Sequence, residues 1–127
     1  MFHKIMVVDD DVLVLEALKE LLASSGYEVK TATRGNEALE LLDQEHFDLL
    51  ILDVVLPKMT GLELCRRVRM RNDEMSKVKI IMLTAKSEVK DIENGKTCGC
   101  DLYLTKPIDP VRLKKLIEDT LKGPAYQ

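Results

Sequence analysis

Four short segments with the pattern of β-strands each end in a residue whose side chain can take part in metal or group-transfer chemistry. These residues are the acidic run Asp9-Asp10-Asp11, then Asp53, Thr84 and Lys106. Clustered carboxylates repel one another unless a cation neutralises them, and hard oxygen ligands with retained waters suit Mg²⁺. A carboxylate can also attack phosphorus and form an acyl phosphate. If the four segments meet, these residues can bind a divalent ion and accept a phosphoryl group.

The remaining two residue types suit the same chemistry. An ammonium such as that of Lys106 offsets negative charge on phosphoryl oxygens, and the Thr84 hydroxyl can donate a hydrogen bond to one of them. Asp53 is the most informative residue, because an isolated carboxylate at the end of a fully apolar strand is costly unless it is paired or functional. Asp11, the third acid of its run, is better explained as a helix cap or a solvated charge than as a metal ligand.

The elements that position these residues are predicted from hydrophobic periodicity. Continuous apolar runs at Ile5–Val8, Leu49–Leu52 and Ile80–Leu83 predict strands buried on both faces. Two further segments, Tyr27–Thr33 and Asp101–Lys106, alternate apolar with polar residues, as is typical of strands at the edge of a sheet or covered on one side.

Between the strands, apolar residues recur at three- and four-residue intervals, which predicts helices. The predicted helices are Val12–Ser25, Asn36–Glu45, one that begins near Thr60-Gly61 and runs through Val68, Ser87–Thr97, and one that begins after the cap Asp109 and ends before Gly123-Pro124. The fourth of these is only weakly apolar and contains Asn94-Gly95, which disfavours a regular helix.

Strand and helix alternate five times along the predicted order. This alternation predicts an α/β fold with a doubly wound, five-stranded parallel sheet, right-handed crossovers and helices on both faces. We expect the flavodoxin-like strand order 2-1-3-4-5, in which ligands bind outside the carboxyl ends of the strands. One domain should cover residues 1–122, with residues 123–127 as a short C-terminal tail or the start of a linker.

Composition excludes several classes of protein. The 127 residues are 46% hydrophobic and 32% charged, which is typical of a soluble globular domain. A net charge of −3 with no basic stripe argues against direct nucleic-acid binding. No apolar run has the length of a signal peptide or a membrane span, so we expect a cytoplasmic protein.

Three cysteines, Cys65, Cys98 and Cys100, lack the paired spacing of a zinc site, and the reducing cytosol disfavours disulfides. We interpret them as structural residues. A metal or redox site at Cys98-Gly99-Cys100 remains an alternative. The two histidines, His3 and His46, are expected to be ordinary surface or strand-edge residues.

Five short motifs together resemble the signature of response-regulator receiver domains in two-component signalling. They are Val7-Val8-Asp9-Asp10, Leu52-Asp53 followed by Leu56-Pro57 and Gly61, Thr84-Ala85, Tyr103-Leu104-Thr105, and Lys106-Pro107. A single motif of this kind is common, but five in this order at the ends of predicted strands are specific, and the match covers nearly the whole chain.

The resemblance implies a role for each residue of the site. Asp53 would accept the phosphoryl group, and Asp10 and Asp53 would bind Mg²⁺ directly. Asp9 would act on the ion largely through water, and the backbone carbonyl of Val55 would be a further metal ligand. Lys106 would contact the phosphoryl group and precede a cis peptide bond to Pro107.

The resemblance also implies a switch. Thr84 and Tyr103 match the pair in which the hydroxyl moves toward the phosphoryl group while the aromatic ring turns inward. The implied partners are a sensor histidine kinase or phosphotransfer protein and a downstream effector domain or protein. Apart from its own phosphoryl transfer and autodephosphorylation, such a domain catalyses no reaction.

Three further positions bear on the lifetime of the phosphorylated state and on dimerisation. Val55 and Lys86 occupy places that influence hydrolysis of the acyl phosphate, and a valine cannot orient an attacking water, so we expect a long-lived phosphorylated state. Leu102 replaces the acid that often follows Asp101, which weakens the analogy with receivers that dimerise through charged pairs.

The same residues argue against three other functions. A phosphatase with an aspartyl nucleophile needs a second acid two residues further on, where this chain has Val55. A flavin- or nucleotide-binding domain needs glycine-rich amides after the first strand, where three acids would repel phosphate. A pseudo-receiver that only binds proteins normally lacks the aspartates or the lysine.

Overall fold

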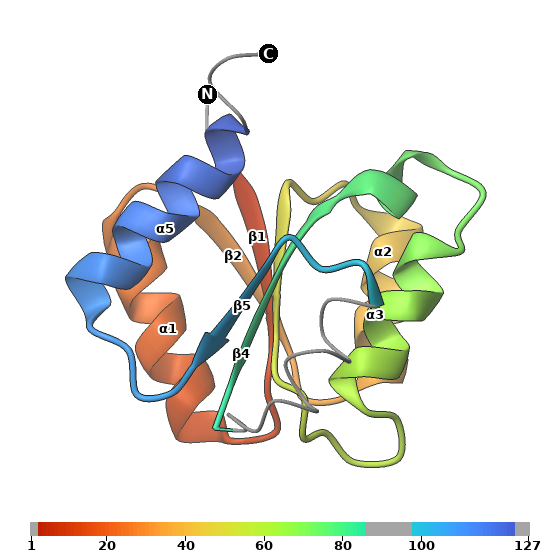
Figure 1. Ribbon diagram of the computed structural model, residues 1–127, viewed down its shortest axis with the longest axis horizontal. Coiled ribbons are helices and arrows are strands. Elements are labelled where there is room, and N and C mark those ends of the chain that lie inside the picture. Colours follow the sequence, from red (N-terminus) through yellow and green to blue (C-terminus); the bar gives the residue numbers. More distant parts are fainter. Residues whose placement is uncertain (1–2, 86–97, 124–127) are drawn as a thin grey trace.

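The computed structural model describes residues 3–85 and 98–123. Five strands form one all-parallel sheet in the order β2-β1-β3-β4-β5 (Figure 1). Their bounds are β1 Lys4–Val8, β2 Glu28–Ala32, β3 Leu49–Leu52, β4 Lys79–Thr84 and β5 Leu102–Thr105. The predicted order is confirmed, as is the expectation that the two alternating segments lie at the edges.

Helices cover both faces of the sheet: α1 and α5 lie on one face, and α2 and α3 lie on the other (Figure 1). Their bounds are α1 Val12–Ser24, α2 Gly35–Gln44, α3 Gly61–Arg69 and α5 Pro110–Lys122, with the short 3₁₀ helix η1 at Glu74–Lys77. The predicted helix bounds that the structure describes agree to within one residue. The helix predicted at Ser87–Thr97 lies outside the described residues.

Side-chain caps start three of the four described α-helices. Asp11 accepts a hydrogen bond from the N–H of Leu13 at 3.0 Å, Thr60 accepts one from Glu63 at 3.1 Å, and Asp109 accepts one from Arg112 at 3.1 Å. Each cap satisfies a backbone donor that the first turn of a helix leaves without a partner. Of the two interpretations of Asp11, helix cap and solvated charge, the structure shows the helix cap.

Two apolar clusters fill the space between the sheet and its helices. Side chains alternate between the faces of a strand, so Ile5 and Val7 pack on the α1 and α5 side while Met6 and Val8 pack on the other. All four residues of β3 are buried. The three central strands are thus covered on both faces, which fixes the carboxyl edge of the sheet as a rigid rim.

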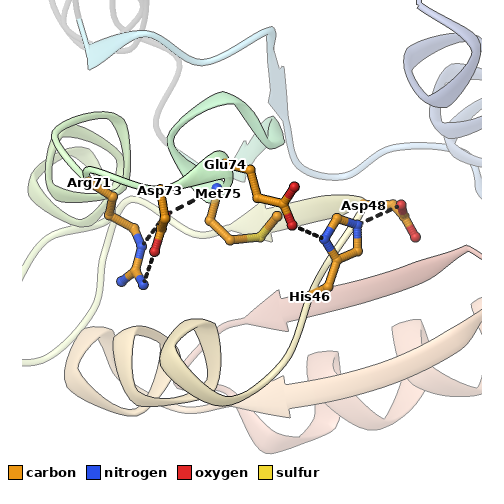
Figure 2. A network of polar contacts seen from close by, with 6 residues as sticks. All are labelled: His46, Asp48, Arg71, Asp73, Glu74 and Met75. Atoms are coloured by element: carbon orange, nitrogen blue, oxygen red, sulfur yellow. Dashed lines mark hydrogen bonds and ion pairs between the residues drawn. The ribbon is translucent and has the colours of Figure 1, made fainter.

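The segment that contains η1 is held by ion pairs (Figure 2). Arg71 Nη2 lies 2.8 Å from Asp73 Oδ2 and 2.8 Å from Asp43 Oδ1 on α2. The hydrogen bond from Arg71 lowers the pKa of the Asp73 carboxyl below its ordinary value of 3.8. Asp73 in turn caps η1 by accepting from the N–H of Met75 at 3.1 Å.

His46 bridges the start of β3 and η1 (Figure 2). Its Nε2 lies 3.3 Å from Asp48 Oδ1 and its Nδ1 lies 3.3 Å from Glu74 Oε1. His46 is exposed, as its interpretation as a surface residue requires.

Of the helices in residues 3–85 and 98–123, none combines the length and the hydrophobicity of a membrane span.

Candidate functional site

The ends of β1 and β3 lie side by side at one edge of the sheet. Val8 pairs with Leu52 in the parallel register, and the next backbone N–H, that of Asp53, donates to the Val8 carbonyl at 3.0 Å. The Asp9 N–H donates to Ala32 at the end of β2 at 3.1 Å. The sheet ladder therefore continues to the first acidic residue of each strand and fixes the backbone from which their carboxylates project.

Three carboxylates converge at this edge. Asp9, Asp10 and Asp53 each offer an oxygen within 4.8 Å of the other two. Asp9 is 3% exposed and Asp53 is 8% exposed, whereas Asp10 lies open to solvent. A set of hard anionic oxygens with one open side fits a Mg²⁺ ion that keeps several of its waters. In the described residues this is the only group of three such side chains close enough to hold a metal ion.

Lys106 adds a positive charge beside two of these carboxylates. Its Nζ lies 2.8 Å from Asp9 Oδ2 and 3.4 Å from Asp53 Oδ2. Burial alone would lower the pKa of Lys106, but the hydrogen bond to Asp9 and the charge of Asp53 outweigh it, so the pKa is raised above its ordinary value of 10.5. The ammonium is thus held in its charged form beside the acids.

The position of Lys106 follows from the end of β5. Its backbone N–H donates to the Thr84 carbonyl at 2.7 Å, which joins it to the end of β4. The peptide bond between Lys106 and Pro107 is cis, as predicted, and α5 begins at Pro110 soon after. The lysine therefore sits on a turn that is anchored at both ends.

The loop after β3 packs tightly against Asp53. Val55 donates its N–H to Asp53 Oδ1 at 3.3 Å, and Gly61 donates its N–H to the Val54 carbonyl at 2.9 Å. A Cβ atom at Gly61 would lie 1.9 Å from the Asp53 carbonyl oxygen, so only glycine fits there. The side chain of Val55 is half exposed, at 51%.

Thr84 and Tyr103 lie on the neighbouring strands. Thr84 ends β4 and is fully buried, and it pairs in register with Thr105 of β5. Tyr103 is half-buried in β5 and packs against the apolar cluster on the α2 and α3 side. Lys86 lies outside the described residues.

The structure therefore brings Asp9, Asp10, Asp53 and Lys106 into one site, with Thr84 at the end of the adjacent strand. Sequence reasoning named Gly61 as part of a motif but did not foresee its contact with the Asp53 backbone. The sequence did carry a signal for this contact. Gly61 occupies the first helical position after the cap Thr60, and a residue with a side chain is ordinarily tolerated there. A glycine there indicates close approach of another backbone.

Known proteins resemble this chain in sequence and in structure. The family model described as response regulator receiver domain matches residues 5–118. The chain is 40% identical over 122 residues to the alkaline phosphatase synthesis transcriptional regulatory protein PhoP of Bacillus subtilis, covering 96% of this chain and 50% of that protein.

Solved structures agree with the sequence match. A putative response regulator from Chloroflexus aurantiacus superposes with a TM-score of 0.91 at 36% identity, covering 97% of this chain and 100% of that one. The receiver domain of a sensor histidine kinase from Pseudomonas aeruginosa, solved with a magnesium ion coordinated in its active-site cleft, gives a TM-score of 0.88 at 26% identity, covering 97% and 100%.

The chain spans about half the length of the curated relatives that it matches. The family match, in contrast, covers nearly all of the chain, and the fold and strand order agree with those of the solved receiver structures. The chain belongs to the response regulator receiver domain family and is a receiver domain of two-component signalling, a phosphorylation-dependent switch.

Proposed function

We propose that Asp53 is the phosphoryl acceptor of this receiver domain. The observation that carries the proposal is the convergence of the Asp53 carboxylate with two further acids and the Lys106 ammonium at the carboxyl edge of the sheet. Asp53 stands at the end of a fully buried strand, and its backbone is fixed by Val8 and Gly61, so its carboxylate is held ready to attack.

The phosphoryl group would come from a histidine of a sensor kinase or phosphotransfer protein. An Asp53 oxygen attacks the phosphorus, the bond from phosphorus to the donor nitrogen breaks, and the imidazole leaves with its electron pair. The Lys106 ammonium, 3.4 Å from Asp53 Oδ2, is placed to hold one of the transferred oxygens. Thr84 lies at the end of the next strand and would donate a hydrogen bond to another oxygen.

Asp10 and Asp53 would ligate Mg²⁺ directly, with the backbone carbonyl of Val55 as a third ligand and Asp9 acting largely through water. When bound, the ion would neutralise charge on the phosphoryl oxygens. The solved Pseudomonas aeruginosa receiver holds magnesium in its active-site cleft, which supports the same occupant for this donor set. Asp9 also stabilises the turn after β1, because its Oδ1 accepts a hydrogen bond from the N–H of Asp11 at 2.9 Å.

Phosphorylation would shift the domain toward an active conformation through Thr84 and Tyr103. Only an energetic difference between the two conformations can move the population. A phosphoryl group that attracts the buried Thr84 hydroxyl supplies such a difference, and Tyr103, half-buried on the adjacent strand, would turn into the space that the hydroxyl leaves.

The chain would catalyse only its own phosphoryl transfer and autodephosphorylation. Its receiver unit would cover residues 1–122, with residues 123–127 as a tail or the start of a linker. The relatives it matches include transcriptional regulators about twice its length, so the output would come from another domain or a partner protein. We propose that the protein is cytoplasmic and that the receiver chain itself binds neither nucleic acid nor membrane.

The experiment that tests this function is intact-mass analysis after incubation with acetyl phosphate, with and without Mg²⁺. Wild type should gain one phosphoryl group only when Mg²⁺ is present, and Asp53→Ala should gain none. Asp11→Asn is a matched control, because it removes a neighbouring carboxylate that caps a helix, and it should still be phosphorylated. A wild type that gains no phosphoryl group and binds no beryllofluoride would favour a pseudo-receiver.

A further inference from the structure

The edge strand β5 leads directly into Lys106, but its own side chains specify its register weakly. Within the described residues β5 pairs with β4 alone, and it is four residues long (Figure 1). Leu102 and Leu104 pack on the α1 and α5 side of the sheet, and Tyr103 packs on the other. All three are apolar and partly buried, so a slip of one residue would exchange apolar side chains for one another. Burial alone therefore does little to exclude such a slip.

The register of β5 nevertheless decides where Lys106 lies. Residues advance by about 3.3 Å along a strand, and successive side chains point to opposite faces. The Nζ of Lys106 lies 2.8 Å from Asp9 Oδ2 and 3.4 Å from Asp53 Oδ2, so a slip of one residue would break both ion pairs. The acidic site thus requires β5 to be fixed by something other than its own apolar residues.

Asp101, directly before β5, binds β4 through two hydrogen bonds. Its N–H donates to the Ile80 carbonyl at 2.8 Å, and its Oδ2 accepts the Ile80 N–H at 2.8 Å. These bonds precede the first residue pair of the ladder between the two strands, Ile81 with Leu102. Because a side-chain group and a backbone group of Asp101 must both meet the same residue, a shifted strand would lose the pair. Asp101 therefore anchors the start of β5 in one register.

Arg69, the last residue of α3, holds this anchor from outside the sheet. Its Nη2 lies 3.1 Å from Asp101 Oδ2, and its Nε donates to the Gly99 carbonyl at 2.8 Å. Its Nη1 donates to the carbonyls of Ser76 at 3.0 Å and Val78 at 2.6 Å, in the connection that leads into β4. A planar guanidinium with donors in fixed directions suits this arrangement. One side chain thus ties the end of α3 to the segments that enter β4 and β5.

The chain before β5 lies directly against α3. Gly99 has a φ of 94°, which residues with a Cβ rarely adopt, and a Cβ there would lie 3.2 Å from Arg69 Cγ. The Cys65 thiol, four residues before Arg69 and on the same face of the helix, donates to the Cys98 carbonyl at 3.4 Å. Two successive carbonyls of this segment are therefore bound to α3, one helical turn apart.

We propose that Arg69 and Asp101 are positioning residues for the phosphorylation site: by fixing the register of β5, they place Lys106 against the acids. They act through the strand, because Asp101 precedes Lys106 by five positions, a span of roughly 16 Å in an extended chain. The effect on phosphoryl transfer rests on the function proposed for Asp53, whereas the effect on β5 exists without phosphorylation.

The first test is native-state hydrogen exchange at neutral pH in buffer without Mg²⁺. The Lys106 N–H donates to the end of β4 and reports the end of β5, whereas the Asp53 N–H donates to β1 and reports the interior of the sheet. Asp101→Ala should speed exchange at Lys106 about tenfold more than at Asp53, because an edge strand can open without global unfolding.

Three further variants sharpen this measurement. Arg69→Ala should reproduce the effect of Asp101→Ala. Asp101→Asn keeps an oxygen that accepts from Ile80 but carries no charge for Arg69, so its effect should be smaller; being nearly isosteric, it also carries the test if Arg69→Ala unfolds the chain. The matched control is Arg71→Ala, which removes an arginine whose ion pairs hold the η1 segment. It should leave the ratio of the two exchange rates unchanged.

The second test asks whether these residues act through Lys106. Phosphoryl uptake from acetyl phosphate and Mg²⁺ is timed for Asp101→Ala, for Lys106→Ala and for the double variant. Asp101→Ala should slow uptake about tenfold, and the double variant should be no slower than Lys106→Ala, because residues that act through one another do not have additive effects. Arg71→Ala should take up the phosphoryl group at the wild-type rate.

Two results would overturn the proposal. One is equal acceleration of exchange at Lys106 and at Asp53 in both Asp101→Ala and Asp101→Asn, which would mean that β5 opens only with the whole sheet. The other is a double variant whose loss of rate is the product of the two single losses. A wild type that takes up no phosphoryl group would instead contradict the function proposed for Asp53, and the exchange ratio would then decide the role of Arg69 and Asp101 by itself.

Discussion

Gly61 packs against the backbone of Asp53 so closely that a Cβ on Gly61 would lie 1.9 Å from the Asp53 carbonyl oxygen. The start of α3 therefore braces the residue proposed to accept the phosphoryl group. The contact involves backbone atoms on the Asp53 side, so no change of rotamer can relieve a clash there.

Gly61→Ala should consequently destabilise the protein by about 2–4 kcal/mol, because overpacking against backbone forces the loop to move. It should also slow phosphoryl uptake, since Asp53 would shift with the loop. Gly26→Ala is a suitable control: it has a φ of 93° and nothing within 4 Å of its Cβ position, so only backbone strain of about 1–2 kcal/mol applies. Urea unfolding of both variants measures the difference, and equal costs would contradict the account.

Lys106 is expected to stabilise the metal-free protein, because its ammonium lies 2.8 Å from Asp9 and 3.4 Å from Asp53. Lys106→Ala leaves the acids without this cation and should cost about 1–3 kcal/mol in the absence of Mg²⁺, a value reduced for the partial exposure of the pair. Added Mg²⁺ should recover part of that loss.

The matched control is Lys115→Ala, which removes a lysine from an exposed i,i+4 pair with Asp119 at 3.2 Å. It should change stability by less than about 0.5 kcal/mol, with or without Mg²⁺. Thermal unfolding of both variants in chelator and in Mg²⁺ makes the comparison. If Mg²⁺ stabilised Lys106→Ala no more than wild type, the acids would not be the ion's ligands.

Val55 should prolong the phosphorylated state. Its side chain is 51% exposed beside Asp53 and cannot orient a water molecule for attack on phosphorus. Val55→Asn should therefore shorten the half-life of the phosphorylated protein, measured as loss of the phosphoryl mass after removal of the donor. Val111→Asn, which alters an exposed valine on α5, should leave the half-life unchanged. Equal half-lives for Val55→Asn and wild type would refute this role.

The ion pair between Arg71 and Asp73 predicts a defined response to acid. Because the folded pKa of Asp73 lies below its ordinary value of 3.8, this carboxylate contributes stability above that value, and the contribution disappears as pH falls through the folded pKa. Asp73→Asn does not titrate, so it should lose less stability than wild type as pH falls below about 5.

Arg71→Ala removes the partner that lowers the pKa, and it should flatten the acid response in the same way. Urea unfolding of the three proteins at a series of pH values measures the response. Parallel curves for wild type and both variants would show that this ion pair is not linked to folding.

The three central strands could be predicted because each is a short, unbroken apolar run, which only full burial explains. The site could be predicted for a related reason: carboxyl ends of parallel strands meet at one edge, so Asp9, Asp53 and Lys106 had to be neighbours. Helix starts were found where a cap residue stands, as at Asp11 and Asp109.

Other features depend on contacts between distant residues. The 3₁₀ helix η1 spans only Glu74–Lys77, too short for any periodicity, and is held by Arg71 and His46. The Cys65 thiol donates to the backbone carbonyl of Cys98, 33 positions away in sequence, and no local pattern predicts such a contact. The sequence predicted structural cysteines because their number is odd, their spacing is not that of a zinc site, and a reducing cytosol disfavours disulfides.

The most direct test of the central claim is borohydride reduction of the phosphorylated protein, followed by peptide mass mapping. Hydride converts an aspartyl phosphate to homoserine and leaves free carboxylates unchanged, so the product marks the acceptor. The account predicts homoserine at position 53 alone, formed only after treatment with a phosphodonor and Mg²⁺. Homoserine at Asp9 or Asp10, or a phosphorylated protein that yields none, would contradict it.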